Sequence, residues 1–215
     1  MTAGRESILR QGAQEMGLSL SDLECAKLLA YGDLILKWNK VYNLTALRDP
    51  SQVLTHHLLD SLSVVAPLQR QCTAAARMLD VGSGAGLPGA VIAVMRPDLS
   101  VTCVDAVAKK AAFLRQVSAE LGLRNLNGMH ARVESFGGSY DVISSRAFAS
   151  LADFFIGSQQ LLAPAGVWMA MKGKLPTDEI EQLPPDLAEV FHVEQLQVPG
   201  LDAERCVVWA RKSAA

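Results

Sequence analysis

Cysteine and histidine are scarce in this sequence, and their spacing is unlike that of a metal site. The 215 residues include four cysteines and four histidines. Cys25, Cys72, Cys103 and Cys206 form no C-x-x-C pair and have no histidines at ligand spacing. We therefore expect no metal ion, no disulfide framework, and the reduced cysteines that are typical of a cytoplasmic protein.

Long apolar runs are missing as well. Arg5, Glu6 and Arg10 interrupt the first ten residues, where a secretory signal would be apolar. The longest uncharged stretch, residues 154–171, is broken by Gly157 and by the turn-forming run Ala-Pro-Ala-Gly at 163–166. It predicts a helix, a turn and a buried strand, and we expect no membrane association.

The chain has no strong charge bias overall, but its charge is unevenly distributed. The formal net charge is −2, which divides into zero over residues 1–70, +3 over residues 71–174 and −5 over residues 175–215. The positive segment suits a polyanionic partner such as a nucleic acid. An ordinary solvated surface explains so small an excess about as well, and the composition gives no indication of oligomeric state.

Glycine, in contrast, is concentrated in one motif that follows a short apolar run. Residues 78–89 read Met-Leu-Asp-Val-Gly-Ser-Gly-Ala-Gly-Leu-Pro-Gly. Gly82, Gly84 and Gly86 allow a sharp turn and a close approach of ligand to backbone, and Pro88 suits the first turn of a helix. A strand, a glycine turn and a helix N-terminus together form a cradle for a nucleotide-like cofactor.

The spacing of these glycines favours S-adenosylmethionine (SAM) over a dinucleotide. A dinucleotide fingerprint places its third glycine where this chain has Leu87, so a NAD-dependent reductase is disfavoured. The D-x-G-x-G-x-G pattern beginning at Asp80 suits SAM, whose ammonium group takes carboxylate and carbonyl partners. Asp105 ends the next apolar run, where an acid accepts ribose hydroxyls in either fold. Candidate cofactor ligands are therefore Asp80, Gly82, Gly84 and Asp105.

The order of the predicted elements indicates an α/β domain behind a helical extension. Residues 1–70 have helical spacing, with a capping box at 21–24 and a second helix start at 49–50. Apolar runs then alternate with helical stretches, which predicts strands at 78–82, 100–105, 126–131, 140–145 and 166–172 and helices at 88–95, 107–121 and 150–162. Residues 188–198 and 205–212 suit an antiparallel edge pair. We predict a Rossmann-like class I methyltransferase fold over residues 71–215: a seven-stranded, mostly parallel sheet with helices on both faces.

More selective strings accompany the glycine motif. They are Lys-Trp-Asn-Lys-Val-Tyr-Asn-Leu-Thr at 37–45, His-Leu-Leu-Asp-Ser at 57–61, Phe-Leu-Arg at 113–115, Arg-Val-Glu at 132–134 and Ser-Arg-Ala-Phe-Ala-Ser at 145–150. Together with residues 80–89 they resemble the bacterial 16S ribosomal-RNA guanine-N7 methyltransferases, the RsmG or GidB family. The resemblance implies a SAM-dependent enzyme that methylates N7 of a guanine in the decoding-region loop of 16S RNA in the small ribosomal subunit.

The resemblance also implies roles for individual residues. Gly82 and Leu87 match SAM contacts of the family, Val133 and Glu134 match the segment that lies against the adenine, and Arg146 matches an arginine at the mouth of the site. Each has a structural alternative, in which Val133 is core, Glu134 stabilises a helix N-terminus and Arg146 is a surface ion-pair partner. Arg146 follows the fourth strand of the predicted sheet, where open α/β sheets bind their ligands, and this favours the functional role.

Several side chains are candidates for contact with RNA. Phe148 is the aromatic residue best suited to stack on a flipped-out guanine, and Arg146 lies beside it in the sequence. Lys172 and Lys174 follow the fifth strand and could meet phosphates, although they could equally be solvated. His57 is expected in a polar seam between the helical extension and the cofactor domain, with Asn39, Asn43, Thr45 and Asp60. Trp38, Tyr42 and Trp168 are interpreted as core.

The segment around Arg146 restricts the chemistry. It contains neither the Asn/Asp-Pro-Pro-aromatic string of exocyclic-amine methylases nor the cysteine nucleophile of cytosine-C5 enzymes. Guanine N7 carries a lone pair and no proton, so alignment with the methyl group could suffice without a general base. The alternatives are a small-molecule or protein methyltransferase of the same fold and a non-enzymatic SAM-binding regulator. A hydrolase triad of His57, Asp60 and Ser61 is excluded because one helix cannot place them in relay.

Overall fold

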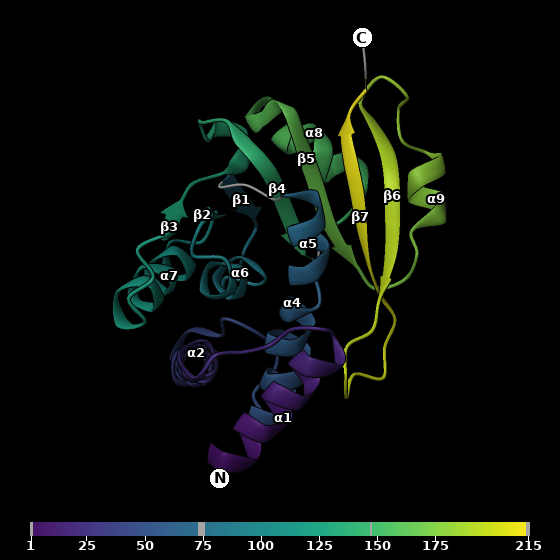
Figure 1. Ribbon diagram of the computed structural model, residues 1–215. Helices are drawn as coiled ribbons and strands as arrows, with labels where there is room; N and C mark the ends of the chain where they lie inside the picture. The colour runs from purple at the N-terminus through teal and green to yellow at the C-terminus, as the bar shows by residue number, and fades with distance from the viewer. Residues whose placement is uncertain (1, 73–75, 147, 214–215) are drawn as a thin grey trace.

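The computed structural model of the chain describes residues 2–72, 76–146 and 148–213. Its centre is a seven-stranded sheet in the order β3-β2-β1-β4-β5-β7-β6 (Figure 1). The first five strands are parallel, and β7 is antiparallel to both β5 and β6. The strands are β1 (Arg77–Val81), β2 (Ser100–Asp105), β3 (Leu126–His130), β4 (Tyr140–Arg146), β5 (Leu162–Lys172), β6 (Ala188–Leu196) and β7 (Arg205–Lys212). The predicted class I methyltransferase fold is confirmed.

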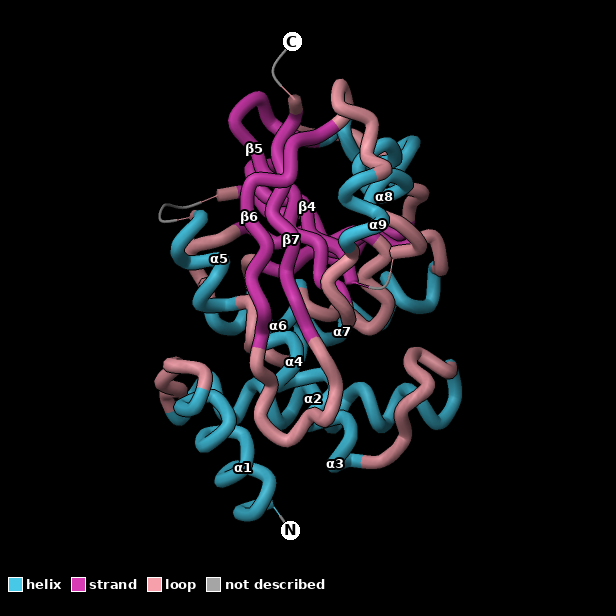
Figure 2. The backbone as a smooth tube through the Cα atoms, turned by 90° about the vertical axis from the view of Figure 1, so that its right-hand side faces the viewer, coloured by secondary structure: helices cyan, strands magenta, loops and turns pink. Residues whose placement is uncertain are grey.

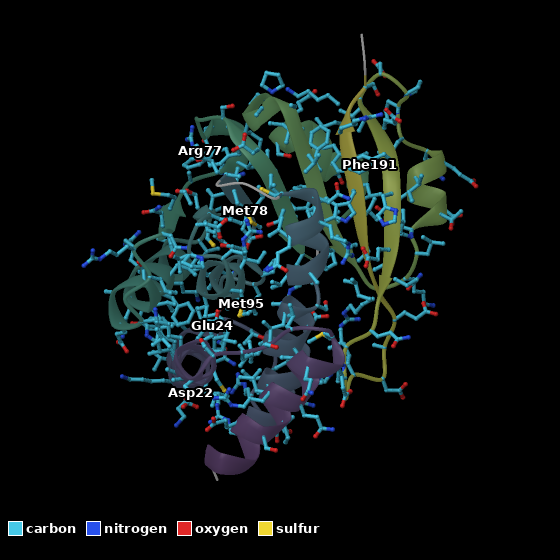
Figure 3. All side chains as sticks on the ribbon, viewed as in Figure 1. Asp22, Glu24, Arg77, Met78, Met95 and Phe191 are labelled. Carbon is cyan, nitrogen blue, oxygen red and sulfur yellow. The ribbon has the colours of Figure 1, made fainter. Side chains whose placement is uncertain are left out.

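Helices cover both faces of this sheet, because each strand alternates between two apolar faces. Met78 of β1 belongs to one buried cluster, against which Met95 also packs (both labelled in Figure 3), and Leu79 of β1 belongs to the other. The first cluster includes residues of α5 (Val65–Gln71), α6 (Gly89–Met95) and α7 (Ala108–Glu120). The second includes residues of α8 (Leu151–Ser158) and is covered further by α9 (Thr177–Glu181).

The N-terminal helices extend the first cluster below the sheet. They are α1 (Thr2–Glu15), α2 (Asp22–Tyr42), α3 (Pro50–Val53), the π-helical segment η1 (Leu54–Leu59) and α4 (Asp60–Leu62). The predicted capping box begins α2, where the Ser21 and Glu24 side chains each accept the other's backbone N–H. One continuous apolar cluster joins these helices to α6 and α7, and the β6–β7 loop reaches down to meet them (Figure 2).

Two expectations from the sequence were wrong: the bounds of one helix and the strand after it, and the burial of one aromatic side chain. The helix predicted over 150–162 ends at Ser158, where a short 3-10 turn (Gln159–Leu161) leads into β5 four residues before the predicted start. Leu162 pairs with Tyr140 across a register irregularity, so the Pro-containing run belongs to the strand. Tyr42 is 41% exposed rather than core. Trp38 is partly buried against the core and Trp168 is fully buried, as expected.

Among the described residues, no helix combines the length and the apolar character needed to cross a membrane.

Candidate active site

Three cavities follow one another along the carboxyl edge of the parallel strands, beside β1 and β4. The Asp105 cavity, of about 170 Å³, is lined by residues that include Gly82. The Gly84 cavity, of about 180 Å³, also includes Gly82 and extends to Arg146. The Asp60 cavity, of about 420 Å³, begins at Arg146. The strand order reverses between β1 and β4, which is where open α/β sheets bind their ligands.

The Asp105 cavity contains most of the predicted adenosine contacts. Asp105 is buried, and its carboxylate accepts the backbone N–H groups of Gly84 at 2.9 Å and Val107 at 2.9 Å. Val133 and Glu134 line the same cavity. Phe148, predicted as an exposed stacking residue for the acceptor base, lies here instead, because its half-buried ring packs on Phe154. Ala147, in the same string, lies outside the described residues.

The glycine loop separates the Asp105 and Gly84 cavities, and its conformation requires glycine. Gly82, Gly84 and Gly86 have φ angles of 63°, 60° and 90°, a region that side chains disfavour. At Gly86 an added Cβ would lie 2.3 Å from a Leu114 methyl, whereas at Gly82 the nearest atom, on the Phe148 ring, would be 4.0 Å away. The backbone at Gly82 therefore faces open space. Leu87, which the resemblance implies is a SAM contact, lines the Gly84 cavity.

A residue of the helical extension supports this loop from below. Tyr31 of α2 is fully buried, and its hydroxyl donates to the Ala85 carbonyl at 2.5 Å. This role could not be predicted from the sequence, because the two residues are 54 positions apart and Tyr31 falls in an ordinary apolar stripe. The helical extension thus contributes directly to the shape of the glycine loop.

Asp80 does not line any of the three cavities, contrary to the prediction. Its fully buried carboxylate accepts the Gly89 backbone N–H at 3.1 Å and the Ser144 hydroxyl at 2.7 Å. Burial raises the pKa of Asp80 to about 6, although both hydrogen bonds act in the opposite direction. At Gly89 an added Cβ would lie 2.9 Å from this carboxylate and 2.5 Å from the sulfur of Cys103. Through these two hydrogen bonds, Asp80 of β1 links the start of α6 to β4.

The Asp60 cavity is built around a buried carboxylate that two arginines share. Asp60 Oδ2 lies 2.9 Å from Arg146 Nη1, and Asp60 Oδ1 lies 2.7 Å from Arg205 Nε. The Asp60 side chain is only 2% exposed, whereas the two arginine side chains, which line the cavity, are each about a quarter exposed. Two cations on one anion leave the group with a net positive charge. Arg205 was not a predicted site residue, since nothing in its local sequence marks it.

His57 lies in the wall of the same cavity and is neutral at physiological pH. Burial and the nearby charge of Arg146 lower the pKa of His57 to about 4. Nδ1 lies 3.0 Å from the His56 carbonyl, which can only accept, so Nδ1 carries the proton. Nε2 then accepts from the Thr45 hydroxyl at 2.8 Å. Asn39 completes the predicted polar seam by accepting the Thr45 N–H at 3.0 Å.

The remaining candidates are less central. Lys172 lines the Asp60 cavity, but its ammonium group lies 2.8 Å from the Glu179 carboxylate. Lys174 is exposed and is not among the residues that line that cavity. Asn43 is exposed at the end of α2, outside the seam, where it adopts a left-handed conformation and accepts from Arg48.

Comparison with known proteins identifies the family. A family model described as rRNA small subunit methyltransferase G (GidB) matches residues 24–208. The chain is 59% identical to the ribosomal RNA small subunit methyltransferase G of Acidovorax sp. (strain JS42), covering 97% of this chain and 96% of that protein. It is 60% identical to the protein of the same name from Polaromonas sp. (strain JS666 / ATCC BAA-500), covering 99% and 96%.

Solved structures share the fold at low sequence identity. TrmN from Thermus thermophilus matches with a TM-score of 0.57 at 21% identity, over 74% of this chain and 53% of that one. A SAM-dependent methyltransferase from Aquifex aeolicus matches with a TM-score of 0.56 at 18% identity, over 78% and 96%. With the family model covering most of the chain and relatives close to 60% identical over nearly its whole length, the chain belongs to the GidB family of rRNA small subunit methyltransferases G.

Proposed function

We propose that this chain transfers a methyl group from SAM to N7 of a guanine in the decoding-region loop of 16S ribosomal RNA, in the cytoplasm. The observation that carries the proposal is the row of three cavities. Gly82 lines both the Asp105 and the Gly84 cavity, and Arg146 lines both the Gly84 and the Asp60 cavity. A cofactor spanning the first two would meet an acceptor in the third. The relatives are named as ribosomal RNA small subunit methyltransferases, which supports RNA as the acceptor.

The residues of the first two cavities fit SAM. A cofactor can lie directly against the backbone at Gly82, where a side chain would otherwise intrude. Asp105 retains lone pairs for ribose hydroxyls, Val133 offers an apolar contact for the adenine, and Leu87 lines the space left for the methionine end. When bound, SAM supplies an electrophilic methyl group. The structural neighbour from Aquifex aeolicus, a SAM-dependent methyltransferase by name, supports this choice.

The Asp60 cavity suits a guanine better than an adenine. Arg146 and Arg205 present N–H donors there, and guanine offers an O6 acceptor where adenine offers an amino group. A donor on O6 would orient the base while leaving the N7 lone pair free for the methyl group. The net positive charge of the group also favours an RNA strand, with its phosphates, over a neutral small molecule. A small-molecule or protein methyltransferase is therefore the second candidate.

Two side chains of this cavity, those of His57 and Asp60, are poorly suited to remove a proton at neutral pH. His57 has a pKa of about 4, which makes it a weak base, and both oxygens of Asp60 are engaged by arginines. Guanine N7 has no proton to lose, so the site needs only to orient the base and exclude competing geometries. We infer that these residues act by positioning.

The pH dependence of single-turnover methyl transfer tests this mechanism. At saturating SAM and RNA, we expect a rate that varies little between about pH 6 and pH 9, because His57 stays neutral above its lowered pKa and no ionisation enters the chemical step. Saturation is verified at each pH, and a His57→Gln variant is run in parallel. A rate that climbs about tenfold per pH unit in the wild type, and loses this dependence in the variant, would make His57 a base and exclude N7 alignment.

A further inference from the structure

A fourth cavity lies on the helical extension, apart from the three just described. It has a volume of about 320 Å³ and is lined by Leu36, Asn39 and Lys40 of α2 and by Arg48 and Pro50 at the start of α3. None of these residues lines the Asp105, Gly84 or Asp60 cavity. Its size is in the range of pockets that hold a nucleotide-sized ligand.

The two cations of this cavity lack acidic partners among the described residues. Lys40 is exposed and forms no ion pair there, and Arg48 donates to the neutral Asn43 side chain at 2.9 Å. The nearest acid in sequence, Asp49, is engaged in capping α3 through the Ser51 N–H at 2.7 Å. Asp33, on the preceding turns of α2, is paired with Arg5. Neither Lys40 nor Arg48 is therefore held in an ion pair by a described acid, and both cations are available to an anionic ligand.

The loop that carries Arg48 also forms part of the proposed active site. Leu47 lines the Asp60 cavity and Thr45 lines the Gly84 cavity. Asn39, in the wall of the fourth cavity, donates to the Leu47 carbonyl at 2.7 Å and accepts the Thr45 N–H. An RNA strand with one nucleotide in the Asp60 cavity can therefore reach this loop with its neighbouring nucleotides. The Lys40 and Arg48 side chains behind the loop are then within reach as well.

We propose that the Lys40–Arg48 cavity is a second RNA-docking site, which binds the phosphate and sugar of a nucleotide flanking the target guanine. The proposal rests on the proposed function and extends it. Lys40 and Arg48 supply donors for phosphate oxygens, and Arg48 can engage two of them at once. Leu36 and Pro50 give an apolar floor for the sugar or base. An acidic segment of a ribosomal protein would meet the same charges but would not require a nucleotide-sized space.

Filter binding of deproteinised small-subunit RNA over a salt series tests the site. For Lys40→Gln combined with Arg48→Gln, we expect an RNA dissociation constant about tenfold higher at moderate salt and a log-log salt slope lower by about two. The SAM dissociation constant should stay unchanged. Arg124→Gln is the matched control, because Arg124 is also exposed and without an ion pair among the described residues. It should bind RNA like the wild type.

Lys40→Gln alone keeps the proposal falsifiable if loss of the Arg48–Asn43 bond disturbs the loop, since the Lys40 side chain forms no hydrogen bond or ion pair in the described part of the chain. An RNA affinity and salt slope equal to those of the wild type in both variants would overturn the docking site. Weaker binding to assembled subunits with unchanged binding to deproteinised RNA would also overturn it, in favour of a protein partner. A wild type that binds RNA with this salt dependence but transfers no methyl group would contradict the proposed function and leave the docking site standing.

Discussion

At Gly82 the proposed cofactor would lie directly against the backbone. Its φ of 63° is nearly the same as that of Gly122, at 61°, which lies after α7 away from the cavities. Valine at either position costs about 1–2 kcal/mol of backbone strain. Only Gly82→Val also places a side chain in the cofactor space, so we expect its SAM affinity to fall at least about a hundredfold. Calorimetry with SAM and with NAD measures this.

Equal SAM binding by Gly82→Val and Gly122→Val would show that the cofactor does not lie against Gly82. Binding of NAD in place of SAM by the wild type would contradict the cofactor assignment itself.

Arg146 and Arg205 share Asp60 and both line the Asp60 cavity, but only one of them also lines a second cavity, which makes their effects separable. Arg205 lines only the Asp60 cavity, whereas Arg146 also lines the Gly84 cavity. We expect Arg205→Gln to lower the single-turnover rate at least about tenfold, through lost orientation of the base, with SAM affinity unchanged. Arg146→Gln should lower both the single-turnover rate and the SAM affinity. Arg211→Gln, on the same strand as Arg205 but paired with Glu189 at an exposed edge, is the control. An equal loss of SAM affinity in Arg205→Gln and Arg146→Gln would contradict the assignment of SAM and of the acceptor base to different cavities.

Single residues could be predicted where motif spacing decides their place. Asp105 lines a cavity because its spacing from the glycine motif places it at a strand end. Leu87, Val133 and Glu134, which only the resemblance implied, line the cavities as well. Asp80 does not, although it also stands at a strand end. It is two residues after Met78, and alternate strand residues share a face, so its carboxylate points toward α6 and not toward the open edge of the sheet.

At the scale of elements, α2 is both part of the core and a support for the glycine loop. We expect Tyr31→Phe to lower the free energy of unfolding by about 1–3 kcal/mol, because the Ala85 carbonyl loses its buried donor. SAM affinity should also fall several-fold through the loop. Tyr42→Phe, at an exposed position of the same helix, should change neither quantity. Denaturant unfolding and calorimetry of the two variants measure both effects, and identical values would mean that Tyr31 merely fills space.

Periodicity predicted the parallel strands and their helices to within a few residues, because each buries an apolar face of the expected repeat. It did not predict the start of β5, where Ala163, Pro164 and Ala165 suit a turn locally but lie within the strand, beside its register irregularity. Nor did it predict the π-helical segment η1, because such turns are rare and follow the same apolar spacing as an α-helix over so few residues. This segment brings His56 and His57 to the wall of the Asp60 cavity, and π-helical turns are frequent at functional sites.

On the scale of the whole molecule, the sheet determines where the acidic and basic side chains lie. The acidic C-terminal segment is partly neutralised at the β6–β7 edge, where Glu189 pairs with Arg211 and Glu194 pairs with Arg70. The Asp60 cavity, with Arg146 of β4 and Arg205 at the start of β7, keeps its positive charge. The Asp60–Arg205 pair, which joins residues 145 positions apart, could not be predicted, because only closure of the whole sheet brings β7 to the helical extension.

The central claim is that this row of cavities directs a methyl group to N7 of one guanine in small-subunit RNA. Mass spectrometry of nuclease fragments of 16S RNA, from cells with and without the gene, tests it most directly. We expect one 7-methylguanosine in the decoding-region fragment, absent without the gene and restored when purified protein and SAM are added to the deficient RNA or subunits. Identical 7-methylguanosine in both RNAs, or loss of a methyl group from a different atom or base, would contradict the account.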